Sequence, residues 1–141
     1  MFNGNNLSLK RLDNDIVEMC FDTSDSVNKL DMATLGEIKQ AADILTADKS
    51  IKGMIYSSAK DTFIVGADIT EFKETFKGTK EALSSSVQSV HDMFNQLEDL
   101  PFPKVAAING FALGGGFELA LTAEYRVIAE TAAVGFPEVK L

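Results

Sequence analysis

The sequence has 141 residues, 45% of them hydrophobic, and a formal net charge of −8. This length fits one domain, and this apolar content is enough for a buried core. The acidic surplus argues against nucleic acid or an anionic membrane surface as the main partner. The single cysteine, Cys20, excludes an intrachain disulfide and fits a reducing compartment. No stretch reads as a signal peptide or a membrane span.

The first part of the chain predicts a hairpin followed by a helix and a buried strand. Residues 7–11 and 16–21 alternate apolar and polar side chains, and the turn-forming sequence at 13–15 lies between them. Asp31 is a candidate helix N-cap, because apolar residues follow it at helical spacing. Residues 51–56 are predicted to form a buried-type strand.

A long amphipathic helix is predicted in the middle of the chain. Apolar residues recur every three or four positions over 83–100, and Pro101 and Pro103 end the pattern. The chain then predicts three shorter elements: a strand over 104–108, a helix over 115–123 and a strand over 126–129. Strands that alternate with helices indicate an α/β fold with mostly parallel pairing.

Some polar residues have ordinary structural interpretations. Asp68, three positions before Glu71, is predicted to cap a helix N-terminus. His91 on the long helix is expected to be structural or exposed, and Lys104 is expected at the surface. No His and Cys cluster in the sequence suggests a metal site.

The stretch 106–124 is the part of the sequence most suggestive of chemistry. A strand-like run ends before three glycines at 114–116, and a helix-forming segment that carries Glu118 comes next. Glycines let the backbone approach a ligand closely, and a helix start leaves N–H groups unpaired at the positive end of the helix dipole. A carboxylate beside free amide donors is what a site needs to stabilise an oxyanion and move a proton.

Three motifs resemble the crotonase (enoyl-CoA hydratase/isomerase) superfamily in order and spacing. They are FIVGADI at 63–69, AAINGFALGGGFE at 106–118 and GFPE at 135–138. Two further stretches, SVNKLD at 26–31 and GADITEF at 66–72, resemble one branch of it. That branch is the alpha subunit of the bacterial fatty-acid oxidation complex, whose N-terminal domain is the hydratase/isomerase.

The resemblance covers nearly the whole sequence but only about the first half of a typical family domain. It implies a crotonase-like ββα spiral with a mostly parallel sheet, of which residues 1–141 form the N-terminal part. The rest of that domain, and any dehydrogenase domain that uses NAD, are expected outside this sequence. The resemblance also implies a bacterial cytoplasmic location and, for the full-length protein, a complex with a thiolase (beta) subunit.

The resemblance implies a site built from two backbone amides and two carboxylates. The N–H groups of Ala67 and Gly115 would hold the thioester oxygen of an acyl-CoA. Glu118 would hold and activate water, and Glu138 would mainly transfer the proton at the α-carbon. Residues expected to contact the substrate or its CoA are Val27, Asn28, Lys29, Gly66, Asp68, Ile69 and Gly114.

The implied reaction is hydration of trans-2-enoyl-CoA to 3-hydroxyacyl-CoA, with a side capacity to move a 3-enoyl double bond to position 2. Acyl-CoA is the substrate, and hydration needs no cofactor. Two alternatives stay open. The same scaffold supports isomerisation alone, thioester hydrolysis or dehalogenation, and the sequence could be a non-catalytic piece with a role in assembly. Residues 1–141 alone are expected to be weakly active or inactive.

Overall fold

The computed structural model describes residues 1–67 and 77–137. Three candidate residues, Asp68, Ile69 and Glu138, lie outside the described residues, as does the helix start predicted at Asp68. Within the described ranges, no helix is long and apolar enough to cross a membrane. No group of three or more His, Cys, Asp or Glu side chains is placed there to hold a metal ion.

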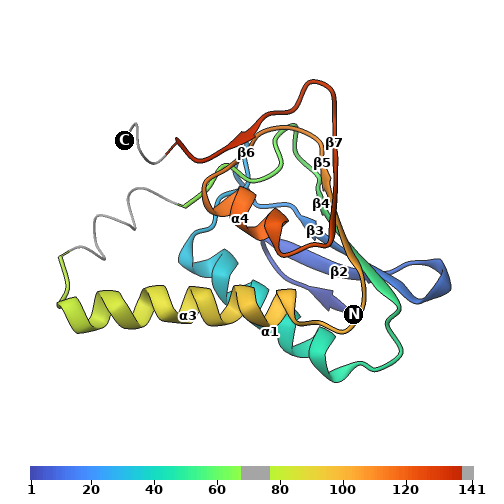
Figure 1. Ribbon diagram of the computed structural model, residues 1–141, viewed down its shortest axis with the longest axis horizontal. Coiled ribbons are helices and arrows are strands. Elements are labelled where there is room, and N and C mark those ends of the chain that lie inside the picture. Colours follow the sequence, from blue (N-terminus) through green and yellow to red (C-terminus); the bar gives the residue numbers. More distant parts are fainter. Residues whose placement is uncertain (68–76, 138–141) are drawn as a thin grey trace.

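A mixed sheet organises the described part of the chain, with six strands in the order β1-β2-β3-β4-β5-β7 (Figure 1). Its strands are β1 (Phe2–Asn3), β2 (Leu7–Arg11), β3 (Ile16–Phe21), β4 (Gly53–Ser58), β5 (Lys104–Ile108) and β7 (Tyr125–Ile128). The pairs β1–β2 and β2–β3 are antiparallel. The pairs from β3 to β7 are parallel, which confirms the predicted mostly parallel α/β fold.

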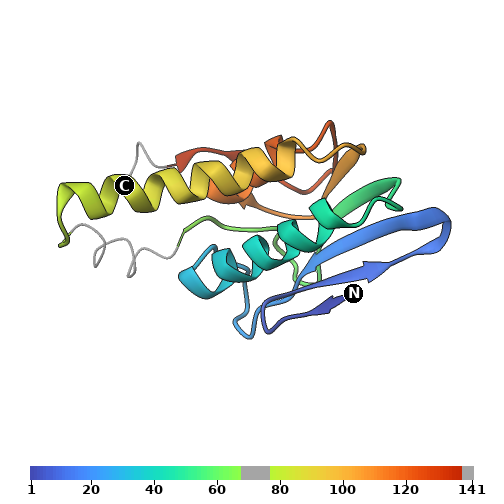
Figure 2. The same ribbon diagram turned by 90° about the horizontal axis from the view of Figure 1, so that it is seen from below.

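Among the described residues, three helices pack around this sheet: α1 (Met32–Ala47), α3 (Lys80–Glu98) and α4 (Gly115–Leu121). A one-turn helix, η1 (Asp13–Asp15), forms the turn between β2 and β3. Figure 2 shows α1 between the β1–β2–β3 end of the sheet and α3, and α1 contacts both β2 and α3. A separate parallel ladder joins β6 (Ala112–Leu113) to β8 (Val134–Gly135).

Two local predictions from the first part of the chain are confirmed. The turn between β2 and β3 places Asn14 and Asp15 at φ values of 61° and 60°, a region that short polar side chains tolerate. At the start of α1, the Asp31 side chain accepts a hydrogen bond from Thr34 N at 2.8 Å. Each of these contacts depends on residues close together in the sequence, which is why the pattern alone predicted them.

Lys104, which we expected at the surface, is instead fully buried at the start of β5. Its Nζ donates to the carbonyls of Glu98 at 3.3 Å, Leu100 at 3.3 Å and Phe102 at 3.2 Å, and to Glu124 Oε1 at 3.0 Å. A cation near the last carbonyls of a helix satisfies orphan acceptors and complements the helix dipole. Lys104 therefore joins the end of α3 to the residue that precedes β7.

The Glu124 carboxylate completes this connection. Burial by itself would raise the pKa of Glu124, but hydrogen bonds from the side chain and backbone of Lys104 outweigh it and hold the pKa below its ordinary value of 4.5. Because this pKa is lower in the folded chain than in the unfolded one, the contact stabilises the fold above pH 4.5. That contribution is lost as the pH falls through the lowered value.

Replacing Lys104 with Met should lower the free energy of unfolding by about 2–3 kcal/mol, because buried carbonyls lose their donor. Urea denaturation at pH 7 measures this change. Lys52→Met is the matched control, since the Lys52 side chain is 72% exposed and lies 3.9 Å from Asp15; it should change the same quantity by less than about 0.5 kcal/mol. Equal effects of the two substitutions would contradict the assigned role of Lys104.

Candidate active site

The FIVGA segment runs alongside the NGFALGGG segment. Phe63 N donates to Phe111 O at 3.0 Å, and Leu113 N donates to Ile64 O at 3.0 Å. A parallel bridge pairs Ile64 with Ala112. Two of the three motifs that carried the resemblance are therefore in direct backbone contact. About 50 residues lie between them in the sequence, so this contact is long-range.

The SVNKL loop lies on the other side of the FIVGA segment. Leu30 N donates to Gly66 O at 2.7 Å, and Val65 N donates to Asn28 O at 2.9 Å. Because of these bonds, the candidate residues Val27 to Lys29 lie beside Gly66 and Ala67. Val27 and Lys29 are half-buried, so both keep some surface open to a ligand.

Asn28 has a structural role that sequence reasoning missed. Its side chain is fully buried. The amide nitrogen donates to the carbonyls of Phe21 and Phe63 and to Ser58 Oγ, and the amide oxygen accepts from Thr23 N. Asn28 thus ties its loop to the ends of β3 and β4. These bonds already occupy its side-chain polar atoms. Its assignment as a residue that contacts CoA stays a prediction.

The backbone at Gly66 approaches the start of α4. Gly66 has φ of +104°, and a Cβ built there would lie 3.2 Å from Leu113 O and 4.0 Å from Gly115 N. The peptide that joins Gly66 to the next residue carries the Ala67 N–H, so the Ala67 and Gly115 amides lie within about 8 Å of each other by ordinary bond lengths. The two predicted donors are therefore neighbours in space.

Both of these amides are unpaired within the described part of the chain. Gly114 N donates to Gly135 O at 2.9 Å, and Glu118 N donates to Gly114 O at 3.0 Å. Neither Ala67 N nor Gly115 N has a hydrogen-bond acceptor among residues 1–67 and 77–137. Gly115 is half-buried and Ala67 is exposed, so each of these N–H groups can bond to water or to a ligand.

The close approach of α4 depends on Gly116. A Cβ at this position would lie 2.2 Å from Ile64 O and 2.8 Å from Ile64 C, and both are backbone atoms. At its other end, α4 is fixed by Thr122, whose Oγ1 lies 2.8 Å from the hydroxyl of the buried Tyr56. Burial raises the pKa of Tyr56 far above its ordinary value, so this hydroxyl stays protonated at neutral pH.

Glu118 lies in the first turn of α4 with an exposed side chain. It lines an open groove of about 450 Å³ between α3 and α4. The other lining residues are Gln88, His91, Phe94, Asn95, Glu98, Leu121 and Thr122. The structure therefore gathers Gly66, Ala67, Gly114, Gly115 and Glu118 around the start of one helix.

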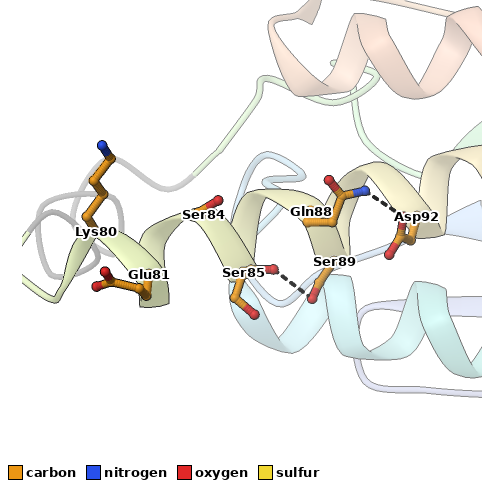
Figure 3. A pocket seen from close by; sticks show the side chains of 7 residues that line it. All are labelled: Lys80, Glu81, Ser84, Ser85, Gln88, Ser89 and Asp92. Carbon is orange, nitrogen blue, oxygen red and sulfur yellow. Dashed lines mark hydrogen bonds between the residues drawn. The ribbon is translucent and has the colours of Figure 1, made fainter.

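A larger hollow of about 680 Å³ lies along α3, and Figure 3 shows its lining. All seven lining residues belong to α3, and none is a predicted site residue. Two of its polar contacts are made within the helix, from Ser89 Oγ to Ser85 O at 3.0 Å and from Gln88 Nε2 to Asp92 Oδ1 at 2.8 Å. This hollow is the solvated face of an amphipathic helix.

The third motif, GFPE, is also brought to this place. Strand β8 pairs with β6, with Ala112 opposite Val134 and Leu113 opposite Gly135. The Phe136 ring lies 5.0 Å from the Phe117 ring, centroid to centroid, at 30°. The backbone that leads into Glu138 is therefore anchored on the GGG loop and on the first turn of α4.

A comparison with known protein families supports this grouping. The family described as enoyl-CoA hydratase/isomerase matches residues 11–141. The chain belongs to the enoyl-CoA hydratase/isomerase family. This finding confirms the resemblance that the three motifs indicated, and the contacts among those motifs show how the family's sequence pattern converges in space.

Curated relatives point to one branch of this family. The chain is 50% identical over 142 residues to a fatty acid oxidation complex subunit alpha from Pseudomonas putida, with 100% of the chain and 20% of that protein covered. It is 49% identical to the subunit of the same name from Acinetobacter baumannii, with 98% and 19% covered. The chain therefore spans about a fifth of the length of these relatives.

Solved structures show the same fold. An enoyl-CoA hydratase from Bacillus anthracis matches with a TM-score of 0.82 at 30% identity, covering 96% of this chain and 52% of that one. An enoyl-CoA hydratase/isomerase from Xanthobacter autotrophicus matches with a TM-score of 0.88 at 28% identity, covering 98% and 51%. The predicted crotonase-like fold, as the N-terminal portion, is thereby confirmed.

Gly116→Ala should destabilise this family member by about 2 kcal/mol or more, because the new Cβ meets the Ile64 backbone rather than a flexible side chain. The measurement is the free energy of unfolding in urea. Gly36→Ala, within α1, is the matched control, since a Cβ there meets nothing within 4 Å; it should be neutral or stabilising by up to about 1 kcal/mol. Similar losses at both glycines would refute the close approach.

Proposed function

We propose that this chain carries the thioester-binding amides and the two carboxylates of an enoyl-CoA hydratase. The reaction adds water across the 2,3-double bond of trans-2-enoyl-CoA to give 3-hydroxyacyl-CoA in fatty-acid β-oxidation. The observation that carries this proposal is a pair of neighbouring amides, Ala67 and Gly115, that have no acceptor among residues 1–67 and 77–137 and lie beside the turn that holds Glu118. The names of the family and of the relatives support the same reaction class.

The two amides would receive the thioester carbonyl oxygen. When the hydroxyl of water bonds to the β-carbon, the electrons of the double bond move toward the thioester, and negative charge develops on its oxygen. Two fixed N–H donors stabilise that charge more in the transition state than in the ground state. In comparable acyl-transfer sites one such donor is worth about 3–4 kcal/mol.

The carboxylates would divide the work on water. Glu118 holds the attacking water and accepts its proton as the new carbon–oxygen bond forms. Glu138, outside the described residues, mainly delivers a proton to the α-carbon of the enolate. One water is consumed, its hydroxyl ends on the β-carbon and a proton on the α-carbon, and proton exchange between the two groups restores both carboxyls.

CoA would lie along the SVNKL loop, where Leu30 N donates to Gly66 O. Lys29 supplies a positive charge there in an otherwise acidic chain, and Val27 offers a half-buried apolar contact. Asp68 and Ile69 continue the Gly66 segment outside the described residues. Gly114 contributes through its backbone conformation, because its N–H is already bonded to Gly135 O.

The same machinery would allow a second proton transfer. Removing a proton from a 3-enoyl-CoA at the α-carbon and returning one at the γ-carbon moves the double bond to position 2 through the same stabilised enolate. The family name includes isomerase, which favours this side activity.

In the complete protein, we further propose a downstream dehydrogenase domain that uses NAD, a thiolase partner subunit and a bacterial cytoplasmic location, since the relatives are named as subunits of a fatty acid oxidation complex.

Glu118→Gln, made in the complete natural form of the chain, should lower kcat for crotonyl-CoA hydration by about 10²-fold or more while the affinity for crotonyl-CoA stays within a few-fold. The ultraviolet absorbance of the conjugated thioester follows turnover. Glu98→Gln is the matched control, because Glu98 lines the same groove from α3, and it should leave kcat unchanged. Full turnover in Glu118→Gln would overturn the proposal, as would an equal loss in both variants.

A further inference from the structure

We infer that Asn28 is a positioning residue for the Ala67 amide, acting through the backbone of the FIVGA segment. The Asn28 side chain is fully buried and is hydrogen-bonded at both its nitrogen and its oxygen. A buried amide bonded in this way holds its neighbours in place, because moving it would leave polar groups without partners. This inference rests on the proposed function, in which the Ala67 N–H donates to the thioester oxygen.

Three hydrogen bonds hold the FIVGA segment to the SVNKL loop. Asn28 Nδ2 donates to Phe63 O at 2.9 Å, and Asn28 O accepts from Val65 N at 2.9 Å. Leu30 N donates to Gly66 O at 2.7 Å. These bonds restrict the segment as far as Gly66, and the next peptide carries the donor N–H of the proposed site.

The remaining bonds of Asn28 connect it to the sheet. Its Nδ2 donates to Phe21 O at 3.3 Å and to Ser58 Oγ at 2.9 Å, and its Oδ1 accepts from Thr23 N at 3.2 Å. Phe21 and Ser58 are the last residues of β3 and β4, and they lie opposite each other in the parallel ladder. One planar amide therefore joins the donor segment to the point at which both strands end.

The same loop also reaches the second donor. Leu30 is buried, and a Cβ built at Gly115 would lie 3.1 Å from Leu30 Cδ1. The backbone of Leu30 pairs with Ala67 in a parallel bridge, while its side chain lies against Gly115. A shift of the loop would therefore change how the two amides lie relative to each other, and Asn28 fixes the loop.

The chemistry of the Asn28 side chain fits positioning better than contact with a ligand. Its oxygen faces an N–H, and its nitrogen faces carbonyl and hydroxyl oxygens. Alanine would offer neither group, and aspartate would turn an oxygen toward the Phe63 carbonyl. A residue that binds CoA would act on KM, whereas a residue that places a transition-state donor acts on kcat.

Asn28→Ala, made in the complete natural form of the chain, should lower kcat for crotonyl-CoA hydration by about tenfold, with KM within about threefold. The reason is that a displaced donor stabilises the transition state less, and a shift of about 1 Å costs up to about 10²-fold in rate. Asn28→Asp, which keeps the shape but not the donors, should show a similar loss. Ser58→Ala removes one partner of Asn28 Nδ2 and should lower kcat by about threefold; it decides the question if the Asn28 variants do not fold.

A spectroscopic measurement separates positioning from general loosening. The enolate of acetoacetyl-CoA differs in ultraviolet absorbance from the neutral thioester. The ratio of bound enolate to bound neutral thioester at one pH therefore measures how well the two amides stabilise the charge, whatever the rate of proton transfer. Asn28→Ala should lower this ratio by about tenfold, and Ser58→Ala by about threefold.

Glu37→Ala is the matched control. The half-buried Glu37 carboxylate also holds a loop in place, because it accepts from the N–H groups of Asn5, Asn6 and Leu7 at 2.6, 2.8 and 3.0 Å. These bonds lie at the turn between β1 and β2, at the far end of the strand order from β5 and β7. Glu37→Ala should lower the free energy of unfolding, as Asn28→Ala does, and leave kcat and the enolate ratio unchanged.

Three results would overturn this inference while leaving the proposed function standing. One is wild-type kcat and a wild-type enolate ratio in folded Asn28→Ala, or in Ser58→Ala if the former does not fold. Another is a raised KM with unchanged kcat, which would make Asn28 a contact of CoA. The third is an equal loss of kcat in Glu37→Ala. If instead the natural chain does not hydrate crotonyl-CoA, or Glu118→Gln turns over fully, the proposed function itself fails.

Discussion

The arrangement of the site depends on the close approach of two backbone segments, one at the start of α4 and one after β4. Gly116 in the first turn of α4 leaves no room for a side chain against the Ile64 backbone. Gly66 curves past the same turn with φ of +104°. Because both contacts involve backbone atoms, the relative position of the Ala67 and Gly115 amides is set by packing of main chain on main chain. Side-chain rotation cannot relax it.

The rest of the fold serves to hold this approach in place. The parallel strands β3, β4 and β5 supply a rigid base, and Asn28 ties the SVNKL loop to it through Phe21 O and Ser58 Oγ. Thr122 and Tyr56 fix the far end of α4, while Lys104 joins the end of α3 to Glu124. With seven residues, α4 has a small dipole, so direct hydrogen bonds from the two amides would supply most of the stabilisation.

Local features of the fold could be predicted from the sequence, and features that depend on distant partners could not. The hairpin turn and the Asp31 cap need only neighbouring residues, and both predictions were correct. Lys104 was expected at the surface because its acceptors lie at the end of α3 and at Glu124, which no periodicity reveals. The role of Asn28 was missed for the same reason, since a buried amide looks like any loop asparagine in the sequence.

The candidate site lies between these two cases. The glycines and the carboxylate of 106–124 indicated amide donors beside an acid, but the residues alone could not show that Ala67 joins them from another segment. The family resemblance supplied that pairing, and the bridge between Ile64 and Ala112 gives its physical basis. The direct test is a crystal structure of the complete natural chain with a slowly reacting acyl-CoA. The account predicts a thioester oxygen about 2.7–3.1 Å from both Ala67 N and Gly115 N. A thioester bound elsewhere, or amides that face separate regions of the protein, would contradict it.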